Sequence, residues 1–213
     1  WKIHNWKRSI NKFNILKDFL YNYSQKEVES LMVISSGVLF SHGIREMNDI
    51  DALMIKSAIE PKVIETINKD KIIDISYPGT SEYNKDWEDV LNERAVSFGA
   101  KNYIELIMDP KYHYYFMGIK FLRLKYEVMT RLKRNRPAQI TDLIVMRQMY
   151  DFSYKLSIPK TKTMFDKKKN KDVTTEVNEK TVLSTIKWYL ETRYFIYLTT
   201  EQIKDWILNY GSQ

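Results

Sequence analysis

The sequence contains no cysteine, which excludes disulfide bonds and zinc sites built from thiolates. With only 6 glycines in 213 residues, it has no Gly-rich dinucleotide fingerprint and no Walker-type phosphate loop. The histidines, His4, His42 and His113, are too scattered to form a histidine-based metal site. No hydrophobic run approaches the roughly 18 residues that a membrane-spanning helix needs, so we expect no membrane span. The lack of cysteine permits a reducing compartment, and the expected location is cytoplasmic.

The composition is that of a folded protein with an excess of positive charge. Hydrophobic residues make up 44% of the chain and aromatic residues 14%, which is enough for one domain with a small helical appendage. The formal net charge of +7 favours anionic partners such as nucleoside phosphates, nucleic acid or acidic lipid. A general abundance of Lys, Ile, Asn and Tyr explains the same charge without any partner. Because the chain begins with Trp, we expect it to belong to a longer protein with other domains.

The most informative segment is Asn48–Ile55, where two carboxylates, Asp49 and Asp51, stand at the start of a hydrophobic run. In a β-strand, residues two apart share a face, so these carboxylates lie together and Ile50 faces the other way. Two carboxylates on one face repel each other unless a cation neutralises them. The pair therefore indicates a site for Mg²⁺ or Mn²⁺, which prefer oxygen ligands.

The residues before this pair predict a strand followed by a short helix. Residues 31–34 are hydrophobic and are typical of a buried strand, which the small residues 35–37 end. Residues 38–45 predict a short apolar turn of helix closed by glycine. The expected order is thus strand, small polar turn, short helix, glycine, and then a strand that opens with the two carboxylates.

This order resembles the nucleotidyltransferase superfamily, whose polymerase-β-like fold places a Gly-Ser pair shortly before an Asp-x-Asp/Glu motif. Here Ser36-Gly37 stands where the small pair belongs, in reversed order, and Asp49-Ile50-Asp51 supplies the motif. The same stretch looks like the LicD/fukutin branch, which carries Ser-Gly-x-Leu-Leu-Gly-x-x-Arg before its acidic cluster and moves phospho-sugar or phospho-alcohol groups. The resemblance covers residues 31 to about 77. It implies an α/β (α+β) fold, a small mixed sheet with flanking helices of nucleotidyltransferase type and a helical C-terminal part.

The resemblance also implies an activity and a set of site residues. The protein would move a nucleotidyl or phospho-sugar group from a nucleotide-activated donor to a hydroxyl acceptor, with Mg²⁺ or Mn²⁺ held by Asp49, Asp51 and a third carboxylate. Asp74 is the candidate for the third, because it lies among isoleucines where an unpartnered charge is costly. An edge strand would instead let Asp74 face solvent. The donor phosphates would contact the residues before the acidic pair, namely Ser35, Ser36, Gly37, His42, Gly43 and Arg45.

Three alternatives to this interpretation stay open. The acidic pair is also typical of a turn with solvated acids, since Asn48 and Asp49 favour turns. A glycosyltransferase with an Asp-x-Asp motif would use the pair to hold a metal on a nucleotide-sugar, although there the motif usually follows its hydrophobic strand. An inactive nucleotidyltransferase-like domain that binds a partner is the third. The acceptor would be a glycan or a small molecule, and nucleic acid stays open as a partner.

The chain divides by texture into an α/β core with an N-terminal helix, residues 1–108, and a mainly helical part, residues 109–213. In the first part we expect a helix from Pro61, a strand over 71–77 and a helix over 86–98.

In the second part, a lysine-rich segment near 160–177 predicts an exposed basic hairpin or loop. Lys120 and Arg123 would lie on a long helix from which they reach a phosphate. The expected helices of this part span residues 111–134, 137–150, 182–190 and 201–208.

Overall fold

The computed structural model describes residues 3–22, 25–55, 73–77, 81–82, 85–166 and 171–209. The helix predicted from Pro61 lies outside these ranges. The chain forms two compact units, Lys2–Glu127 and Val128–Gln213, and Trp1 is counted with the second. The dividing point falls inside a helix, later in the chain than the boundary expected at residue 108. Among the described residues, no helix has both the length and the hydrophobicity to cross a membrane.

The N-terminal unit is mixed α/β and is built on a five-stranded mixed sheet in the order β3-β2-β1-β7-β6. β1 is antiparallel to β2 and parallel to β7, β2 is parallel to β3, and β6 and β7 form an antiparallel hairpin. The strands are β1 (Leu31–Ile34), β2 (Ile50–Met54), β3 (Ile73–Ser76), β6 (His113–Phe116) and β7 (Ile119–Leu122). The small mixed sheet with flanking helices confirms the coarse fold class.

Helices and one small strand pair surround this sheet. The pair is β4 (Ser81–Glu82) with β5 (Lys85–Asp86). The helices are α1 (Ile3–Tyr21), α2 (Gln25–Glu29), α3 (Ser36–Ser41), α5 (Trp87–Ser97), α6 (Tyr103–Met108) and the first turn of α7 (Leu124–Arg134).

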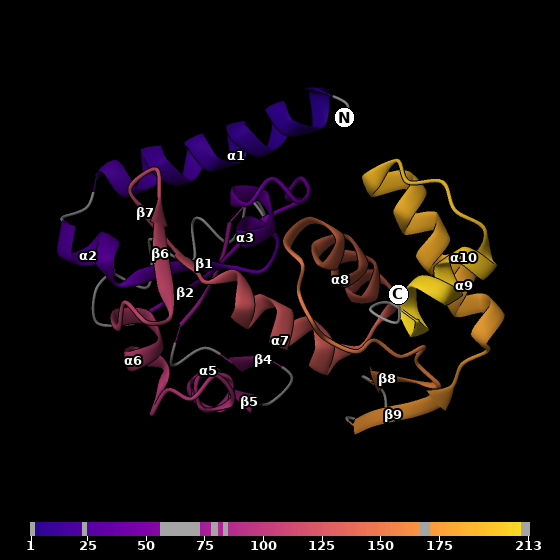
Figure 1. Cartoon of the computed structure of the whole chain (residues 1–213). Coiled ribbons are helices and arrows are strands. Elements are labelled where there is room, and N and C mark those ends of the chain that lie inside the picture. Colours follow the sequence, from indigo (N-terminus) through magenta and orange to yellow (C-terminus); the bar gives the residue numbers. More distant parts are fainter. Residues whose placement is uncertain are drawn as a thin grey trace. The chain divides into compact units, whose positions relative to one another are not determined.

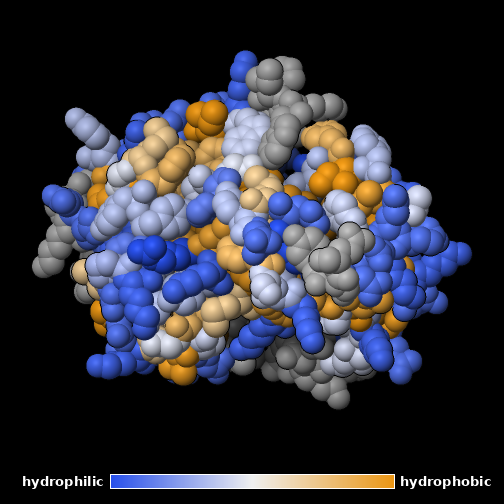
Figure 2. Space-filling view, viewed as in Figure 1, coloured by the Kyte–Doolittle hydropathy of each residue, from blue (hydrophilic) through white to orange (hydrophobic). Residues whose placement is uncertain are grey.

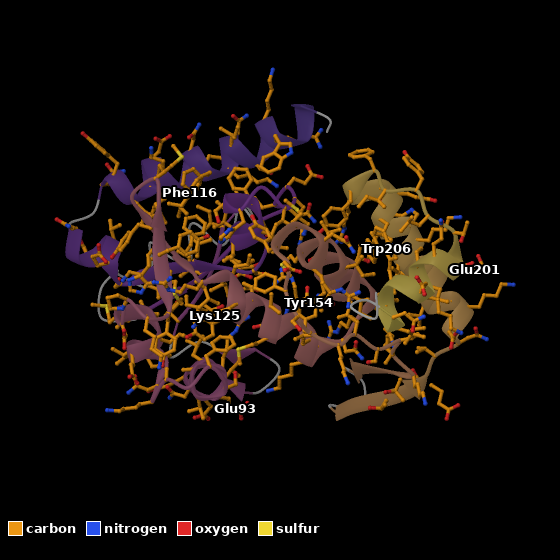
Figure 3. The ribbon with its side chains drawn as sticks, in the orientation of Figure 1. Glu93, Phe116, Lys125, Tyr154, Glu201 and Trp206 are labelled. Carbon is orange, nitrogen blue, oxygen red and sulfur yellow. The ribbon has the colours of Figure 1, made fainter. Side chains whose placement is uncertain are left out.

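One face of the sheet packs against α1 (Figure 1). Phe13 of α1 lies 5.8 Å from Phe116 of β6 and 6.1 Å from Phe121 of β7, measured between ring centroids, and Figure 3 labels Phe116 below this helix. Ser9 connects α1 to the segment before the acidic pair, because its Oγ accepts a hydrogen bond from Met47 N at 3.0 Å. The helix therefore fixes the approach of the chain to β2.

The other face packs against α6, and a buried lysine joins the two. Lys120 of β7 is 2% exposed, and its Nζ donates to the carbonyl oxygen of Ile107 at 3.0 Å and forms an ion pair of 3.1 Å with the Glu29 carboxylate. Neighbouring strand residues face opposite sides, so Lys120 and Phe121 mark the two faces. Because Lys120 is buried in a strand and paired, its predicted helical position and contact with a phosphate are wrong.

The helix predicted over 111–134 is in fact the β6–β7 hairpin followed by α7. The chain reverses at Met117 and Gly118, which both have positive φ, 50° and 81°. Such a two-residue loop matches the twist of a hairpin but favours Asn-Gly over Met-Gly. Tyr, Phe and Ile on both sides of the loop suit strands.

The C-terminal unit is mainly helical. Its helices are α8 (Pro137–Tyr150), α9 (Glu179–Tyr189), which a π-helical turn (Leu190–Tyr194) extends, and α10 (Thr200–Leu208). β8 (Thr161–Asp166) and β9 (Lys171–Glu176) form an antiparallel hairpin within the segment where the sequence predicts a hairpin or loop.

A buried carboxylate organises the interior of this unit. Asp142 of α8 is 3% exposed, and its Oδ2 accepts from Arg131 Nε at 3.2 Å. Its Oδ1 lies 2.5 Å from the hydroxyl of Tyr194 and 3.9 Å from Arg193 Nη1. Because a buried charge is stable only when it is paired and hydrogen-bonded, this cluster indicates a structural role.

Candidate active site

The register of β1 and β2 brings the small polar turn next to the acidic pair. Ile34, the last residue of β1, is paired with Asp51 of β2, so the chain leaves β1 beside the start of β2. The buried Ser36, first residue of α3, donates from its Oγ to the carbonyl oxygen of Asp49 at 2.9 Å. The predicted neighbours Ser35, Ser36, Asp49 and Asp51 are therefore brought together.

Asp74 lies directly beside Asp51. The two residues are paired across the parallel strands β2 and β3, so their side chains leave the same face of the sheet. Paired residues on neighbouring strands are about 5 Å apart along the hydrogen-bonding direction. β3 is the edge strand of the described sheet and Asp74 is exposed, whereas Asp51 is half-buried. The third carboxylate thus lies next to Asp51 on the solvent side.

A fourth carboxylate, Glu127, was missed by the sequence analysis. It lies on α7, its side chain is completely buried, and its Oε1 accepts from the backbone N–H of Ser35 at 2.6 Å. Its position would have been detectable, because Leu124, Glu127 and Arg131 follow the helical spacing of a buried face. Because residues 111–134 were predicted as one uninterrupted helix, the buried face of α7 was not recognised.

The carboxylates influence one another electrostatically. Burial, the largest cause, and the negative charge of Asp49 raise the pKa of Asp51 to about 6. The Ser35 side-chain hydrogen bond opposes this rise, and the charges of Asp74 and Glu127 add smaller increases. Burial and the charge of Asp49 also raise the pKa of Asp74. A carboxyl that titrates near pH 6 is suited to accept a proton near neutral pH.

The raised pKa of Asp51 makes the metal-free protein less stable at neutral pH. The folded protein binds more protons than the unfolded chain between about pH 4 and pH 6, so stability falls as pH rises through that window. We expect the Asp51→Asn variant to match wild type near pH 4 and to exceed its free energy of unfolding by up to about 3 kcal/mol at pH 7. Denaturant unfolding in a chelator at both pH values measures this difference. A difference that does not change with pH would contradict the shifted pKa.

Ser35 holds a backbone conformation that favours glycine. Its φ is 58° and its ψ is −125°, at the junction of β1 and α3. Such a conformation costs a non-glycine residue of the order of 1–3 kcal/mol and persists only where surrounding contacts hold it. The hydrogen bond from Ser35 N to Glu127 is one such contact.

We expect Ser35→Gly to be more stable than Ser35→Ala by about 1–2 kcal/mol. Both variants lose the hydroxyl that reaches Asp51, and only glycine relieves the backbone, so the alanine variant is the matched control. Urea unfolding of the two variants gives the difference. Equal stabilities would show that the turn is unstrained.

Gly37 allows α3 to pack closely on the sheet. A Cβ at this position would lie 2.4 Å from Val33 Cγ1, closer than atoms approach in folded proteins. Valine is stiff at χ1, so it has little room to move away. The observed reason for this glycine is therefore close packing of helix on strand.

His42 and Gly43 lie at the other end of α3, about 9 Å further along at 1.5 Å per residue. Gly43, with φ of 68°, ends the helix, since Gly43 N donates to Phe40 O and Ile44 N donates to Leu39 O, both at 2.9 Å. Arg45 Nη1 donates to the carbonyl oxygen of Glu46 at 2.9 Å.

His42 packs against an aromatic ring. Its ring centroid lies 5.2 Å from that of Tyr114, and burial lowers the pKa of His42. Ser36 and Asp49 are joined by a hydrogen bond at one end of α3, whereas His42, Gly43 and Arg45 follow its other end. The structure thus places Ser35, Ser36 and Gly37 at the start of α3 and His42 and Gly43 at its end, while Arg45 lies on the stretch that returns to Asp49.

The donor set suits a hard divalent cation, because Mg²⁺ and Mn²⁺ prefer carboxylate oxygens. Asp49, Asp51 and Asp74 would hold it. In the part of the chain that the structure describes, no three His, Asp or Glu side chains converge closely enough to hold a metal ion as they stand. Binding would therefore require these carboxylates to turn toward a common point. The charge of the bound cation would then offset the repulsion between them.

Comparison with known proteins adds no relative to this description. A scan of protein-family models, a search of curated proteins and a search of solved structures each gave no match.

Proposed function

We propose that this protein is a divalent-metal-dependent transferase of the nucleotidyltransferase type. It moves a nucleotidyl or phospho-sugar group from a nucleotide-activated donor to a hydroxyl acceptor, such as a glycan or a small molecule. The observation that carries this proposal is the in-register pairing of Asp51 with Asp74 on neighbouring parallel strands. Asp49 lies two residues before Asp51, and the β1–α3 turn lies beside both.

The position of the acidic pair within its strand supports this interpretation over a glycosyltransferase. β2 begins at Ile50, inside the Asp-x-Asp motif, and continues through the hydrophobic residues after it. The motif thus opens its strand, as the resemblance implies, whereas in the glycosyltransferase arrangement the motif would follow the strand. The short helix between β1 and β2 matches the same order.

Each side chain of the site has a separate role in the proposed transfer reaction. Asp49 and Asp51, with Asp74 as the candidate third ligand, would hold the metal, which when bound would neutralise charge on the donor phosphates. Asp74, exposed at the sheet edge, would either complete the metal site or accept the proton of the acceptor hydroxyl. Ser36 fixes the backbone at Asp49 through its hydrogen bond, and Glu127 fixes the turn at Ser35. Arg45 pairs with a donor phosphate after releasing the Glu46 carbonyl.

A donor screen with identification of the leaving group tests this proposal. The protein is incubated with Mn²⁺ and nucleoside triphosphates, nucleotide-sugars or CDP-alcohols, and the released products are separated. Pyrophosphate indicates nucleotidyl transfer, and a nucleoside monophosphate indicates transfer of a phospho-sugar or phospho-alcohol. A nucleoside diphosphate from a nucleotide-sugar would indicate hexosyl transfer and overturn the proposal. Absence of turnover together with absence of Mn²⁺ binding would indicate an inactive binding domain.

A further inference from the structure

The net positive charge of this protein resides entirely in its C-terminal unit. Residues 1–127 contain 18 Lys and Arg and 18 Asp and Glu, so they carry no formal net charge. Residues 128–213 contain 16 Lys and Arg and 9 Asp and Glu, and they carry the whole +7. Charge concentrated in one unit, rather than spread along the chain, is typical of binding to an anionic partner.

Part of this charge gathers on one surface of the unit. At the end of α7, Lys133, Arg134 and Arg136 are exposed. The turn that carries them lies beside the segment that leads into β8, because Asn135 Nδ2 donates to Ser157 Oγ at 3.4 Å. That segment adds further exposed lysines, so the surface, named here the basic surface, consists of Lys133, Arg134, Arg136, Lys155, Lys160 and Lys162.

The exposed side chains of segment 153–162 all end in hydroxyl or ammonium groups. Its exposed residues are Ser153, Lys155, Ser157, Lys160, Thr161 and Lys162.

The residues between them are turned inward and hold the segment in place. Leu156 is buried, and the hydroxyl of Tyr154, labelled in Figure 3, donates to the carbonyl oxygen of Leu143 at 2.5 Å. The Tyr154 ring continues a series with Phe152 and Tyr150, with centroids 6.0 and 6.1 Å apart. The donors are thus presented on an irregular segment that is anchored to α8 and runs into β8.

We propose that the basic surface binds the phosphate backbone of a nucleic acid strand without reading its base sequence. Lys, Arg and Ser side chains are the groups that contact phosphate oxygens in such complexes, and a succession of them along one segment matches a repeating anion. An acidic membrane is disfavoured, because membrane-binding surfaces combine cations with exposed large apolar side chains, and the most exposed side chains of 153–162 are all polar. This proposal does not depend on the proposed transfer reaction.

Binding of a labelled, mixed-sequence single-stranded oligonucleotide, measured by fluorescence anisotropy in a chelator, tests the proposal. The triple variant Lys155→Gln/Lys160→Gln/Lys162→Gln is compared with wild type at several salt concentrations. We expect affinity to fall about tenfold or more at about 0.1 M salt. Losing three phosphate contacts should also reduce the slope of log K against log salt by roughly 2.

The matched control is Lys7→Gln/Lys17→Gln/Lys101→Gln, which removes the same charge from exposed positions of the N-terminal unit. It should bind within about twofold of wild type with an unchanged salt slope. An equal loss of affinity in the two triple variants would show that binding depends only on net charge, and it would overturn the proposal. It would also be overturned by a wild-type protein that does not bind the oligonucleotide, including one that binds phosphatidylserine vesicles instead. Because no metal is present, these outcomes are independent of catalysis.

Discussion

Replacing Asp51 with Asn should abolish metal-dependent transfer while leaving the protein folded. Asp51 lies between Asp74 on the neighbouring strand and Asp49 two residues earlier, so it is central to the proposed metal ligands. Asn keeps the shape but removes the charge that attracts the cation, which is worth several kcal/mol of charge stabilisation. We expect the rate to fall by about a thousandfold or more. Initial rates of donor consumption with Mn²⁺ present measure this loss.

The matched control is Asp18→Asn, which makes the same charge change on the exposed side of α1. It should retain wild-type activity. Without metal, Asp51→Asn should be at least as stable as wild type at pH 7, since it removes a carboxylate whose pKa burial and its neighbours raise. An Asp51→Asn variant that keeps full metal-dependent activity would refute the assignment. Marked loss of metal-free stability would show that the carboxylate is structural.

Replacing Glu127 with Ala should destabilise the N-terminal unit by about 2–3 kcal/mol. The substitution leaves the backbone N–H of Ser35 without the acceptor that it contacts at 2.6 Å and opens a cavity at a fully buried position. Because Ser35 also has a strained φ, the turn between β1 and α3 should relax and activity should fall with stability. Denaturant unfolding gives the stability change. Glu93→Ala on the exposed side of α5, labelled in Figure 3, should stay within about 0.5 kcal/mol of wild type.

Glu127→Gln separates the hydrogen bond of Glu127 from its charge. Gln keeps an oxygen that accepts from Ser35, so the fold should be retained. It removes a negative charge that contributes to the raised pKa of Asp51, so that pKa should fall below about 6. Titration of the Asp51 carboxyl by NMR in wild type and variant detects this change. An unchanged pKa would show that Glu127 exerts no electrostatic effect on the site.

The sequence predicted the order of the elements that carry the site better than the way these elements pair and pack. The order from β1 to β2 and the strand that carries Asp74 follow from short patterns of apolar and small residues. Strand periodicity predicted Asp49 and Asp51 as neighbours; in the structure Asp49 lies just before β2 and its charge acts on Asp51. The pairing of Asp74 with Asp51 required the register between β2 and β3, which no local pattern specifies.

The hairpin left little signal in the sequence, and Glu127 was missed as a consequence. The loop at Met117 and Gly118 places methionine at positive φ, where hairpins usually have Asn or Gly, so the turn left little signal. Because this turn was not recognised, residues 111–134 were predicted as one helix. Within that helix Glu127 resembled an ordinary exposed charged residue. The basic surface depended on the division at Glu127, because the charge of the whole chain conceals a neutral unit and a positive one.

The surface of the molecule gives few functional indications by composition alone. Figure 2 shows hydrophilic and hydrophobic residues intermixed over the face in view. Several large hydrophobic residues are exposed singly, such as Tyr21 at 90% and Tyr197 at 73%. Scattered residues of this kind are normal on folded proteins.

Titration of the protein with Mn²⁺, followed by the EPR signal of the free ion, tests the central claim most directly. We expect wild type to bind Mn²⁺ weakly alone and more tightly when a nucleoside triphosphate is present. Asp51→Asn should lose both modes of binding, and Asp18→Asn should keep them. A wild-type protein that does not bind Mn²⁺ in either condition, or an Asp51→Asn variant that binds it as wild type does, would contradict the account.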